Sequence, residues 1–306
     1  MNKSKLRVLV VINPNASKAD AALAALSSWF TKNCQALIVV AKTDKELRQE
    51  IEVHGKEVDL IVIGGGDGTV SKALPQLLKI KRSFAVLPLG TANDFARTLG
   101  LPSDPLKAAE IALNGREHRI DIGLVNDWPY LNVASIGIAS KVAKAQSKKL
   151  KRRWRVFAYA IGLMQAVRDL QPFFVKLNLD GKSIWSGPVY QVSVGNGRFH
   201  GGGLTVAEDA AIDDGKLDIY LIYPGRFWHL FASFMHLKFG LARPEVLKQR
   251  SALNVTLHTD RPRSVDADGE LATETPATFG LRPAALTVIV PRILPVDHRG
   301  LSRRPS

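Results

Sequence analysis

The sequence predicts an N-terminal α/β domain with a parallel sheet, followed by a β-rich domain with an antiparallel sandwich. Three observations lead to this fold class. The chain has 306 residues, enough for about two domains. Strand-like and helix-like segments alternate through residue 120, which is typical of a parallel sheet covered on both faces. Beyond residue 119, short strand-like runs are separated by turns. We place the domains at residues 1–122 and 123–290, and the tail, 291–306, is free to pack back on the first domain.

The elements of the first domain follow from local patterns. Its strands are short runs rich in β-branched or apolar residues, at Arg7–Asn13, Ala36–Ala41, Asp59–Ile63 and Phe84–Leu87. Ala19–Lys32 has helical spacing of its apolar residues. Thr43 is expected to cap a second helix, with Glu46 completing a capping box. A third helix is expected from about Thr69, and another begins at Asp104-Pro105, with proline at its first position.

The second domain is predicted from apolar runs between turn residues. The expected strands are Ile120–Val125, Phe174–Leu179, Val189–Val194, Leu217–Ile222, Ala252–Leu257 and Leu286–Val290. Asp180-Gly181 and Asp268-Gly269 are dipeptides typical of tight hairpins. Two helical insertions, near residues 140–170 and 226–248, interrupt the strands.

Composition narrows the function classes. The single cysteine, Cys34, excludes an intrachain disulfide and a four-cysteine zinc site. No apolar stretch reaches the ~18–20 residues of a membrane-spanning helix, so we expect a cytoplasmic protein that is soluble or peripheral to a membrane. The formal net charge of +14 is concentrated in residues 141–155, which hold eight basic residues and no acidic one. A diffuse nucleic-acid-binding surface is therefore not indicated.

The basic segment has two interpretations. Residues 141–155 form either a solvated surface or a surface that is attracted to anionic membranes. RNA binding is disfavoured because aromatic residues follow the basic run without interleaving with it. The aromatic segment 227–241 is either a buried helix or an interfacial one.

Glycine-rich turns suggest a phosphate site. Leu60–Ile63 runs into Gly64–Thr69 at the expected start of a helix, an arrangement that presents backbone N–H groups and a helix dipole to an anion. It lacks the spacing of a dinucleotide fingerprint or a Walker A loop. Alone, it fits a tight turn without a ligand equally well. Val86–Phe95 makes a second such turn and Asn13–Ser17 a polar third, and the ends of parallel strands meet at one edge. Together they favour a nucleotide cleft between the two domains.

Ordered motifs then resemble a known family. The motifs are Gly65-Gly66-Asp67-Gly68-Thr69, Pro88–Ala96, Asp121-Ile122-Gly123, Gly195–Arg198 with Gly201–Gly203, Asp213–Asp218, and Asp268-Gly269-Glu270. This set is similar to the catalytic domain of diacylglycerol-kinase-type lipid kinases, which include sphingosine, ceramide and soluble bacterial lipid kinases. It extends in the family's order from about residue 7 to 290. The first motif alone is shared with NAD kinases and phosphofructokinases, whose Rossmann-like α/β domain the resemblance implies here.

The resemblance implies ATP- and Mg²⁺-dependent phosphorylation of a lipid hydroxyl, on diacylglycerol or a related lipid. The residues that it assigns to the nucleotide site are Asn13, Pro14, Asn15, Ala16, Ser17, Thr43, Gly65, Gly66, Asp67, Gly68, Thr69, Gly90, Thr91 and Asn93. Asp67 would organise the catalytic Mg²⁺, with Asp94 and Asp121 behind it, and Glu270 or Asp268 would accept the hydroxyl proton. A further Mg²⁺ would be held by the Asp214 carboxylate and the carbonyls of Ala211 and Lys216.

The residue types at these positions are compatible with phosphoryl transfer even without the family resemblance. A carboxylate at Asp67, among phosphate-facing amides, would repel phosphate unless a metal lay between them. Asp268 and Glu270 are two apart, so on a strand they would share a face, although a plain hairpin with solvated acids has the same sequence. Ser71-Lys72 departs from the family's Asn-Glu, and Lys72 would face phosphate or solvent. Ser17 is followed by Lys18 where the family has glycine.

Other functions and partners stay open at this point. The alternatives are a small-molecule kinase such as an NAD kinase, and a non-catalytic module that binds nucleotide or membrane. The expected partners are a lipid substrate and a peripheral anionic membrane surface, with no specific nucleic acid. A homodimer is left open.

Overall fold

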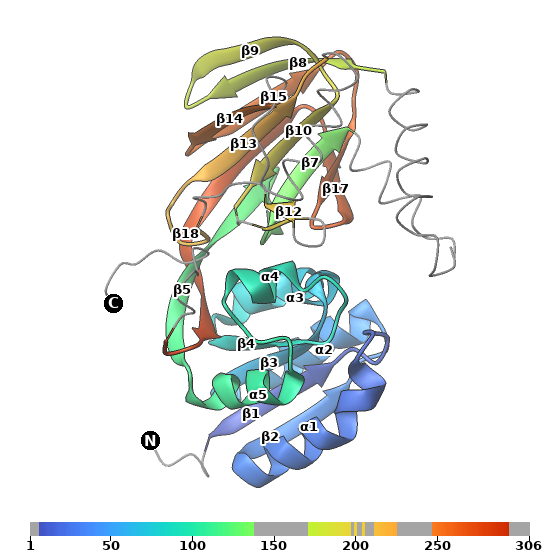
Figure 1. The fold of residues 1–306 in the computed structure, drawn as a ribbon, viewed down its shortest axis with the longest axis vertical. Helices are drawn as coiled ribbons and strands as arrows, with labels where there is room; N and C mark the ends of the chain where they lie inside the picture. Colours follow the sequence, from blue (N-terminus) through green and yellow to red (C-terminus); the bar gives the residue numbers. More distant parts are fainter. Residues whose placement is uncertain are drawn as a thin grey trace.

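The computed structural model describes residues 6–137, 171–196, 199–200, 204–205, 211–224 and 247–293. It confirms an α/β part with a parallel sheet and an antiparallel sandwich (Figure 1). The predicted insertion 140–170, which contains the basic segment 141–155, lies outside the described residues. Most of the predicted insertion 226–248, with the aromatic segment 227–241, and most of the tail also lie outside them. None of the helices in the described ranges has the length and apolar character that would let it span a membrane.

The first part is a parallel sheet covered by helices on both faces. Its strands are β1 (Arg7–Ile12), β2 (Gln35–Val40), β3 (Leu60–Gly65) and β4 (Phe84–Pro88), in the order β2-β1-β3-β4. Its helices are α1 (Ala19–Asn33), α2 (Asp44–His54), α3 (Asp67–Ile80), α4 (Asp94–Thr98) and α5 (Pro105–Asn114). Each predicted strand and helix of this part is present, and α3 begins two residues earlier than expected.

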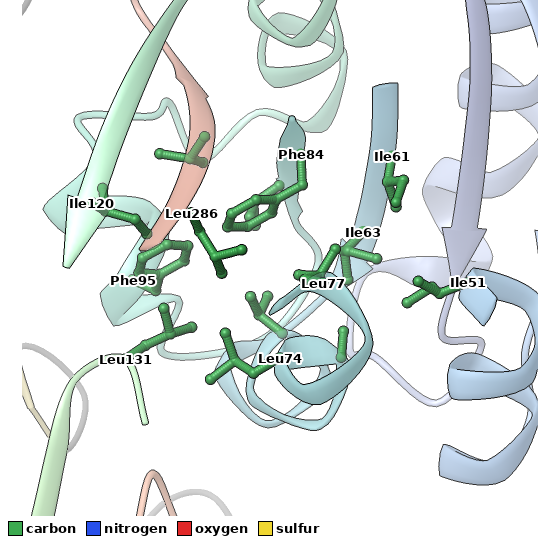
Figure 2. Close-up of a cluster of buried hydrophobic side chains, with 14 of the residues drawn as sticks. Ile51, Ile61, Ile63, Leu74, Leu77, Phe84, Phe95, Ile120, Leu131 and Leu286 are labelled. Carbon is green, nitrogen blue, oxygen red and sulfur yellow. The ribbon is translucent and has the colours of Figure 1, made fainter. Parts of the chain in front are cut away.

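Alternating side chains of these strands pack into two separate hydrophobic cores, one on each face of the sheet. Leu9 and Ile63 pack with α2, α3 and α4 on one face of the sheet, in the cluster shown in Figure 2. Val8 and Val62 pack with α1 and α5 on the other. Asp104 caps α5, as predicted, by accepting the N–H groups of Leu106 and Lys107. Because the sheet is buried on both faces, its chemistry is confined to the loops at the strand ends.

The remaining strands form the sandwich and connect it to the parallel sheet. The large sheet continues from β4 through β18 (Ala277–Val290), β15 (Val255–Thr259), β8 (Phe173–Leu179) and β9 (Lys182–Val189). The strand β5 (Arg116–Val125) pairs with β18, and β6 (Trp128–Tyr130) pairs with β5. The second sheet is β14 (Leu247–Ala252), β13 (Leu217–Ile222), β10 (Gln191–Gly195), β7 (Val133–Gly137), β16 (Ser264–Ala267) and β17 (Glu270–Glu274). A two-stranded sheet joins β11 (Phe199–His200) and β12 (Leu204–Thr205).

The fourteen residues of β18 tie the two parts together. One end of β18 pairs with β15 in the sandwich, and Val288 near the other end is in register with Phe84 of the parallel sheet. The strand β5 runs beside it in antiparallel register, and both extend between the two parts in Figure 1. The predicted boundary at residue 122 falls within β5 and stays a prediction. At the start of the tail, Arg292 Nε donates to the Asn114 carbonyl at the end of α5 (2.7 Å).

Two predicted strands are each divided between two sheets, for one physical reason. The run Val189–Val194 is divided at Tyr190, where the chain leaves β9 in one sheet and enters β10 in the other. The run Ala252–Leu257 is divided after Ala252, between β14 and β15. The residues on both sides of each crossing face the same sandwich core, so the sequence stays apolar through the change of sheet. The predicted insertion 226–248 also extends two residues too far, because β14 begins at Leu247.

Candidate functional site

The polar loop after β1 is joined to the glycine loop after β3. Asn13 Nδ2 donates to Thr69 Oγ1 (2.9 Å), and the Asn13 backbone N–H donates to the Gly64 carbonyl (2.9 Å). Asn13 Oδ1 also accepts the Asn15 N–H at 2.9 Å, which closes a local turn that contains Pro14. These contacts place the predicted first and second phosphate loops side by side at one edge of the sheet.

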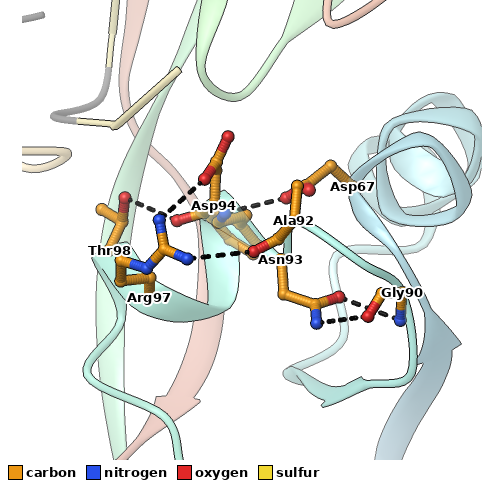
Figure 3. A network of polar contacts seen from close by, with 8 residues as sticks. Asp67, Gly90, Ala92, Asn93, Asp94, Arg97 and Thr98 are labelled. Atoms are coloured by element: carbon orange, nitrogen blue, oxygen red, sulfur yellow. Dashed lines mark hydrogen bonds and ion pairs between the residues drawn. The ribbon is translucent and has the colours of Figure 1, made fainter. Parts of the chain in front are cut away.

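The loop after β4 completes this edge. The Ser17 hydroxyl donates to the Leu89 carbonyl (3.2 Å), and the Thr91 hydroxyl lies 3.5 Å from Ser17 Oγ. Asn93 adopts a left-handed conformation with φ of 53°. Its side chain brackets Gly90, because Oδ1 accepts the glycine N–H (3.0 Å) and Nδ2 donates to the glycine carbonyl (2.8 Å) (Figure 3). The three loops therefore form one continuous polar rim.

Thr43 lies at the start of α2 and acts there as a helix cap. Its hydroxyl accepts the Glu46 N–H at 3.1 Å, as predicted. The Glu46 carboxylate accepts the N–H of Lys42 (2.7 Å), one residue before the cap, so the second bond of the capping box is displaced by one residue. Asn15 Nδ2 donates to the Lys42 carbonyl at 3.4 Å, which joins this cap to the first loop.

Asp67 is the first residue of α3 and connects two helix N-termini. Its Oδ1 accepts the Phe95 N–H of α4 at 2.9 Å (Figure 3). Within the described residues, Oδ2 has no hydrogen-bond partner. The carboxylate is half-buried, beside the backbone amides of the glycine loop. An anionic oxygen with a vacant lone pair at a phosphate-type loop suits a divalent cation, so the donor chemistry fits Mg²⁺.

Asp268 is held in the tight turn between β16 and β17. Asp268 and Gly269 have positive φ angles of 50° and 90°, as a two-residue Asp-Gly hairpin requires. Asp268 Oδ2 accepts the Leu131 N–H (2.7 Å), and Oδ1 accepts the N–H groups of Asn132 (3.0 Å) and Val133 (3.1 Å). The side chain is thus fixed in orientation by the loop before β7.

The pKa of Asp268 also relates it to Asp67. Burial raises the pKa of Asp268 to about 6, the three N–H hydrogen bonds oppose this rise, and the negative charge of Asp67 adds to it. Asp67 belongs to the phosphate edge and Asp268 to the sandwich, so this effect of charge acts between the two parts of the molecule.

Glu270 lies two residues beyond Asp268 and makes a different contact. Its Oε1 lies 3.1 Å from Lys72 Nζ, and the same ammonium lies 2.9 Å from Asp44 Oδ2. The sequence predicts that Lys72 faces phosphate or solvent. In the structure, its ammonium instead lies between the carboxylates of Asp44 and Glu270. No sequence pattern reveals this ion pair, because Lys72 and Glu270 belong to different parts of the chain.

Asp214 lies in the loop expected to hold a second metal. Its Oδ1 accepts the Lys216 N–H (2.9 Å) and its Oδ2 the Ala211 N–H (3.3 Å), so it contacts the two residues whose carbonyls were expected as ligands. Burial raises the pKa of Asp214, with smaller contributions from the charges of Asp218 and Asp121. A cation would relieve this crowding of acids. Over the described ranges, however, no group of three or more metal-ligating side chains gathers, so this metal site stays a prediction.

Two further acids are engaged in other contacts. Buried Asp121 accepts the N–H groups of Gly215 (2.8 Å) and Ala284 (2.7 Å), and so joins β5 to the Asp214 loop and to β18. Asp94 Oδ1 lies 3.1 Å from Arg97 Nη1 (Figure 3). Their expected place behind the catalytic Mg²⁺ stays a prediction.

Two further buried or largely buried polar side chains, Asn196 and His118, make contacts that the sequence does not reveal. Asn196 Nδ2 donates to the carbonyls of Asp121 (2.9 Å) and Leu131 (3.0 Å), and so joins the motif after β10 to the loop that binds Asp268. His118 Nε2 lies 2.8 Å from Asp213 Oδ2, in a largely buried pair. Their partners are distant in sequence, and no local pattern identifies them. Arg198 and Gly201–Gly203 lie outside the described residues.

Comparison with protein families divides the chain into two matches. Residues 7–125 match the diacylglycerol kinase catalytic domain. Residues 132–290 match the YegS C-terminal NAD kinase beta sandwich-like domain. The two matches cover the parallel sheet with its phosphate loops and the sandwich with its Asp-Gly hairpin, respectively.

Individual relatives agree with these matches. A probable lipid kinase YegS-like from Pseudomonas putida is 34% identical over 245 residues, which cover 78% of this chain and 80% of the relative. A diacylglycerol kinase from Bacillus subtilis is 29% identical, over 78% of this chain and 79% of the relative.

Solved structures share the fold. A diacylglycerol kinase structure from Bacillus anthracis has a TM-score of 0.74 at 24% identity, over 94% of this chain and 98% of that one. An NAD kinase from Archaeoglobus fulgidus, solved in complex with ATP, has a TM-score of 0.50 at 13% identity, over 96% of each chain. At these identities the likeness concerns the fold alone.

Proposed function

Because this chain belongs to the family of lipid kinases with a diacylglycerol kinase catalytic domain and a YegS-type C-terminal domain, we propose that it transfers the γ-phosphoryl group of ATP to a lipid hydroxyl, with Mg²⁺. The family identified from the motifs is thereby confirmed. The observation that carries the proposal is the ion pair between Lys72 of α3 and Glu270 of β17, which joins the helix that begins at Asp67 to the hairpin that holds Asp268. Phosphoryl transfer needs a metal-binding acid and an acceptor-activating base across one cleft.

The three loops at the sheet edge are suited to the ATP phosphates. The glycine loop and the N-terminus of α3 offer backbone N–H groups, and Asn13, Ser17 and Thr91 line the same rim. Asp67 would hold Mg²⁺ through Oδ2, since Oδ1 already accepts the Phe95 N–H. When bound there, Mg²⁺ supplies neutralisation of the negative charge on the phosphates.

Asp268 is the better candidate for the base. Oδ1 accepts two N–H groups and is saturated, whereas Oδ2 accepts only one and keeps a lone pair for the substrate hydroxyl. A pKa of about 6 lies close to neutral pH, where a general base is most effective. Glu270 is held by Lys72 and is therefore less available to accept a proton.

Direct assay of transfer tests this proposal. The purified chain is incubated with radiolabelled ATP and Mg²⁺, and with mixed micelles that contain diacylglycerol, ceramide or a sphingoid base, and the extracted lipid is counted and identified by mass spectrometry. We expect a phosphorylated lipid from at least one acceptor, and none from the Asp268→Asn variant.

Parallel arms separate the alternatives. NAD is offered as an acceptor, and ATP binding is measured by calorimetry with and without Mg²⁺. Phosphorylation of NAD but of no lipid would instead indicate a small-molecule kinase. ATP binding without transfer to any acceptor would favour a non-catalytic module.

A further inference from the structure

Lys72 connects the two parts of the molecule. It belongs to α3, and its Nζ lies 2.9 Å from Asp44 Oδ2 at the start of α2 and 3.1 Å from Glu270 Oε1 at the start of β17. The Lys72 side chain is 29% exposed, against 52% for Asp44 and 43% for Glu270, so the ammonium is the most enclosed member of the three.

The electrostatics favour a permanent cation at this position. The hydrogen bond to Asp44 raises the pKa of Lys72, partial burial lowers it, and the contact with Glu270 raises it again, with a net increase. Lys72 therefore stays charged throughout the physiological pH range. It is also held between two carboxylates, one from each part of the molecule.

Lys72 and Asp67 are on one rigid element, and Glu270 and Asp268 are on another. Asp67 is the first residue of α3, and Lys72 lies on the same helix between one and two turns later. Asp268 and Glu270 belong to a hairpin that is stiffened by two positive φ angles and by the bond from the Gly269 N–H to Asp266 Oδ1 (2.9 Å). The ion pair between Lys72 of α3 and Glu270 of the hairpin therefore constrains the distance between Asp67 and Asp268.

We propose that Lys72 is a positioning residue, which holds the β16–β17 hairpin against α3 and thereby sets the distance between Asp268 and the phosphate edge marked by Asp67. The inference rests on the proposed function for its catalytic consequence. The ion pair between Lys72 and Glu270, which we call the tie, does not depend on any activity. The presence of the tie and its effect on kcat are therefore tested separately.

Zero-length cross-linking tests the tie. A carbodiimide activates a carboxyl group, a neighbouring amine displaces the activated oxygen as a urea, and an amide bond joins the two side chains. Peptide mapping by mass spectrometry of the treated full chain should find Lys72 joined to Glu270 and to Asp44. The Lys72→Arg variant keeps the positive charge but forms no such amide, so both products should disappear. A Lys72–Asp44 product without a Lys72–Glu270 product would overturn the proposal.

Kinetics test the consequence with a matched control. Lys79 is on the same helix and pairs with Glu52 within the first part only, so Lys79→Met removes an ion pair without touching the hairpin. We expect Lys72→Met to lower kcat about fivefold, because a partly exposed pair contributes little, with KM for ATP unchanged. Lys72→Arg should restore most of kcat, and Lys79→Met should resemble wild type.

Three results would decide against the proposal or its premise. A kcat for Lys72→Met equal to that of wild type contradicts positioning. A raised KM for ATP with kcat unchanged would mean that Lys72 contacts the nucleotide instead. Absence of transfer in wild type, with the Lys72–Glu270 product present, contradicts the proposed function while the tie stands.

Discussion

Gly66 and Gly90 face one another backbone to backbone where the loops after β3 and β4 meet. A Cβ atom on Gly90 would lie 2.5 Å from the Gly66 Cα and 2.9 Å from Asn93 Oδ1. Separations this short do not occur between real side-chain and backbone atoms, so one loop would have to move. The contact shows that the two glycine-rich motifs, although separate in sequence, form one structure.

Gly90→Ala should therefore destabilise the fold and disturb the phosphate edge. We expect the free energy of unfolding to fall by about 1–3 kcal/mol, as for an overpacked core, and the affinity for ATP to fall with it. Gly68→Ala is the matched stability control, because a Cβ there meets nothing within 4 Å. Urea titration of both variants measures the difference. Equal stability of Gly90→Ala and Gly68→Ala would contradict the close approach.

Asp67 combines a structural hydrogen bond with a charge, and two substitutions separate them. Asp67→Asn keeps an oxygen that can accept the Phe95 N–H but loses the charge, whereas Asp67→Ala loses both. We expect both variants to lose transfer by about 100-fold or more, the scale of one electrostatic contact in a transition state. Asp67→Ala alone should also lose about 1 kcal/mol of stability. Chelation of Mg²⁺ should abolish transfer by wild type. Near-normal transfer by Asp67→Asn would refute the metal role.

The raised pKa of Asp268 predicts a pH dependence of transfer. Below a pKa of about 6 the carboxyl is protonated and cannot accept the hydroxyl proton, so kcat/KM should rise with pH through this region and level off above it. Bound Mg²⁺ would offset the charge of Asp67 and move this limb toward lower pH. If kcat/KM did not rise with pH anywhere between about 4 and 7, Asp268 would be excluded as the base.

Stability should change with pH in the opposite direction. The folded-state pKa of Asp268 lies above its unfolded value, so the fold binds this proton more tightly than the unfolded chain does. The contribution of Asp268 is therefore fully present below the unfolded pKa, near 4, and is lost as pH rises through about 6. Urea titrations of wild type and of Asp268→Asn at pH 4.5 and 7 should show this loss in wild type only.

The features of the candidate site that the sequence predicts correctly are turns formed by local segments. The turns at Asn13, Gly66 and Gly90 each follow a strand and precede a helix, and the parallel-sheet rule places such turns at one edge. The Asp268-Gly269 hairpin was likewise visible as a dipeptide. These features were predicted because neighbours in the chain determine them.

Contacts between distant segments could not be predicted in this way. Asp268 accepts the Leu131 N–H, and Glu270 pairs with Lys72, which belongs to the other part of the molecule. The changes of sheet at Tyr190 and Leu253 were missed because both sheets share one core and keep the sequence apolar. The sequence pattern reports burial, and it does not report which sheet a buried strand joins.

A substitution of the buried Asp121 tests whether this acid is structural or belongs to the catalytic metal site. It accepts two backbone N–H groups, from Gly215 and Ala284, and Asp121→Asn leaves a single acceptor oxygen for them. We expect a loss of about 1.5–3 kcal/mol in the free energy of unfolding, the value of a hydrogen bond to a charged group. The Mg²⁺ concentration for half-maximal transfer should stay as in wild type. A large increase in that concentration at unchanged stability would place Asp121 with the catalytic metal instead.

The basic segment gives a prediction that rests on charge alone. Neutralising Lys148, Lys149, Lys151, Arg152 and Arg153 removes five of the eight basic residues in 141–155. Each cation near an anionic bilayer contributes at most about 1 kcal/mol, so binding to phosphatidylserine vesicles should fall about tenfold or more. ATP affinity should not change, because the phosphate edge lies elsewhere in the chain. Vesicle sedimentation at low and high salt provides the control, since wild-type binding should weaken as salt screens the charges. Equal vesicle binding by the two proteins would identify the segment as a solvated surface.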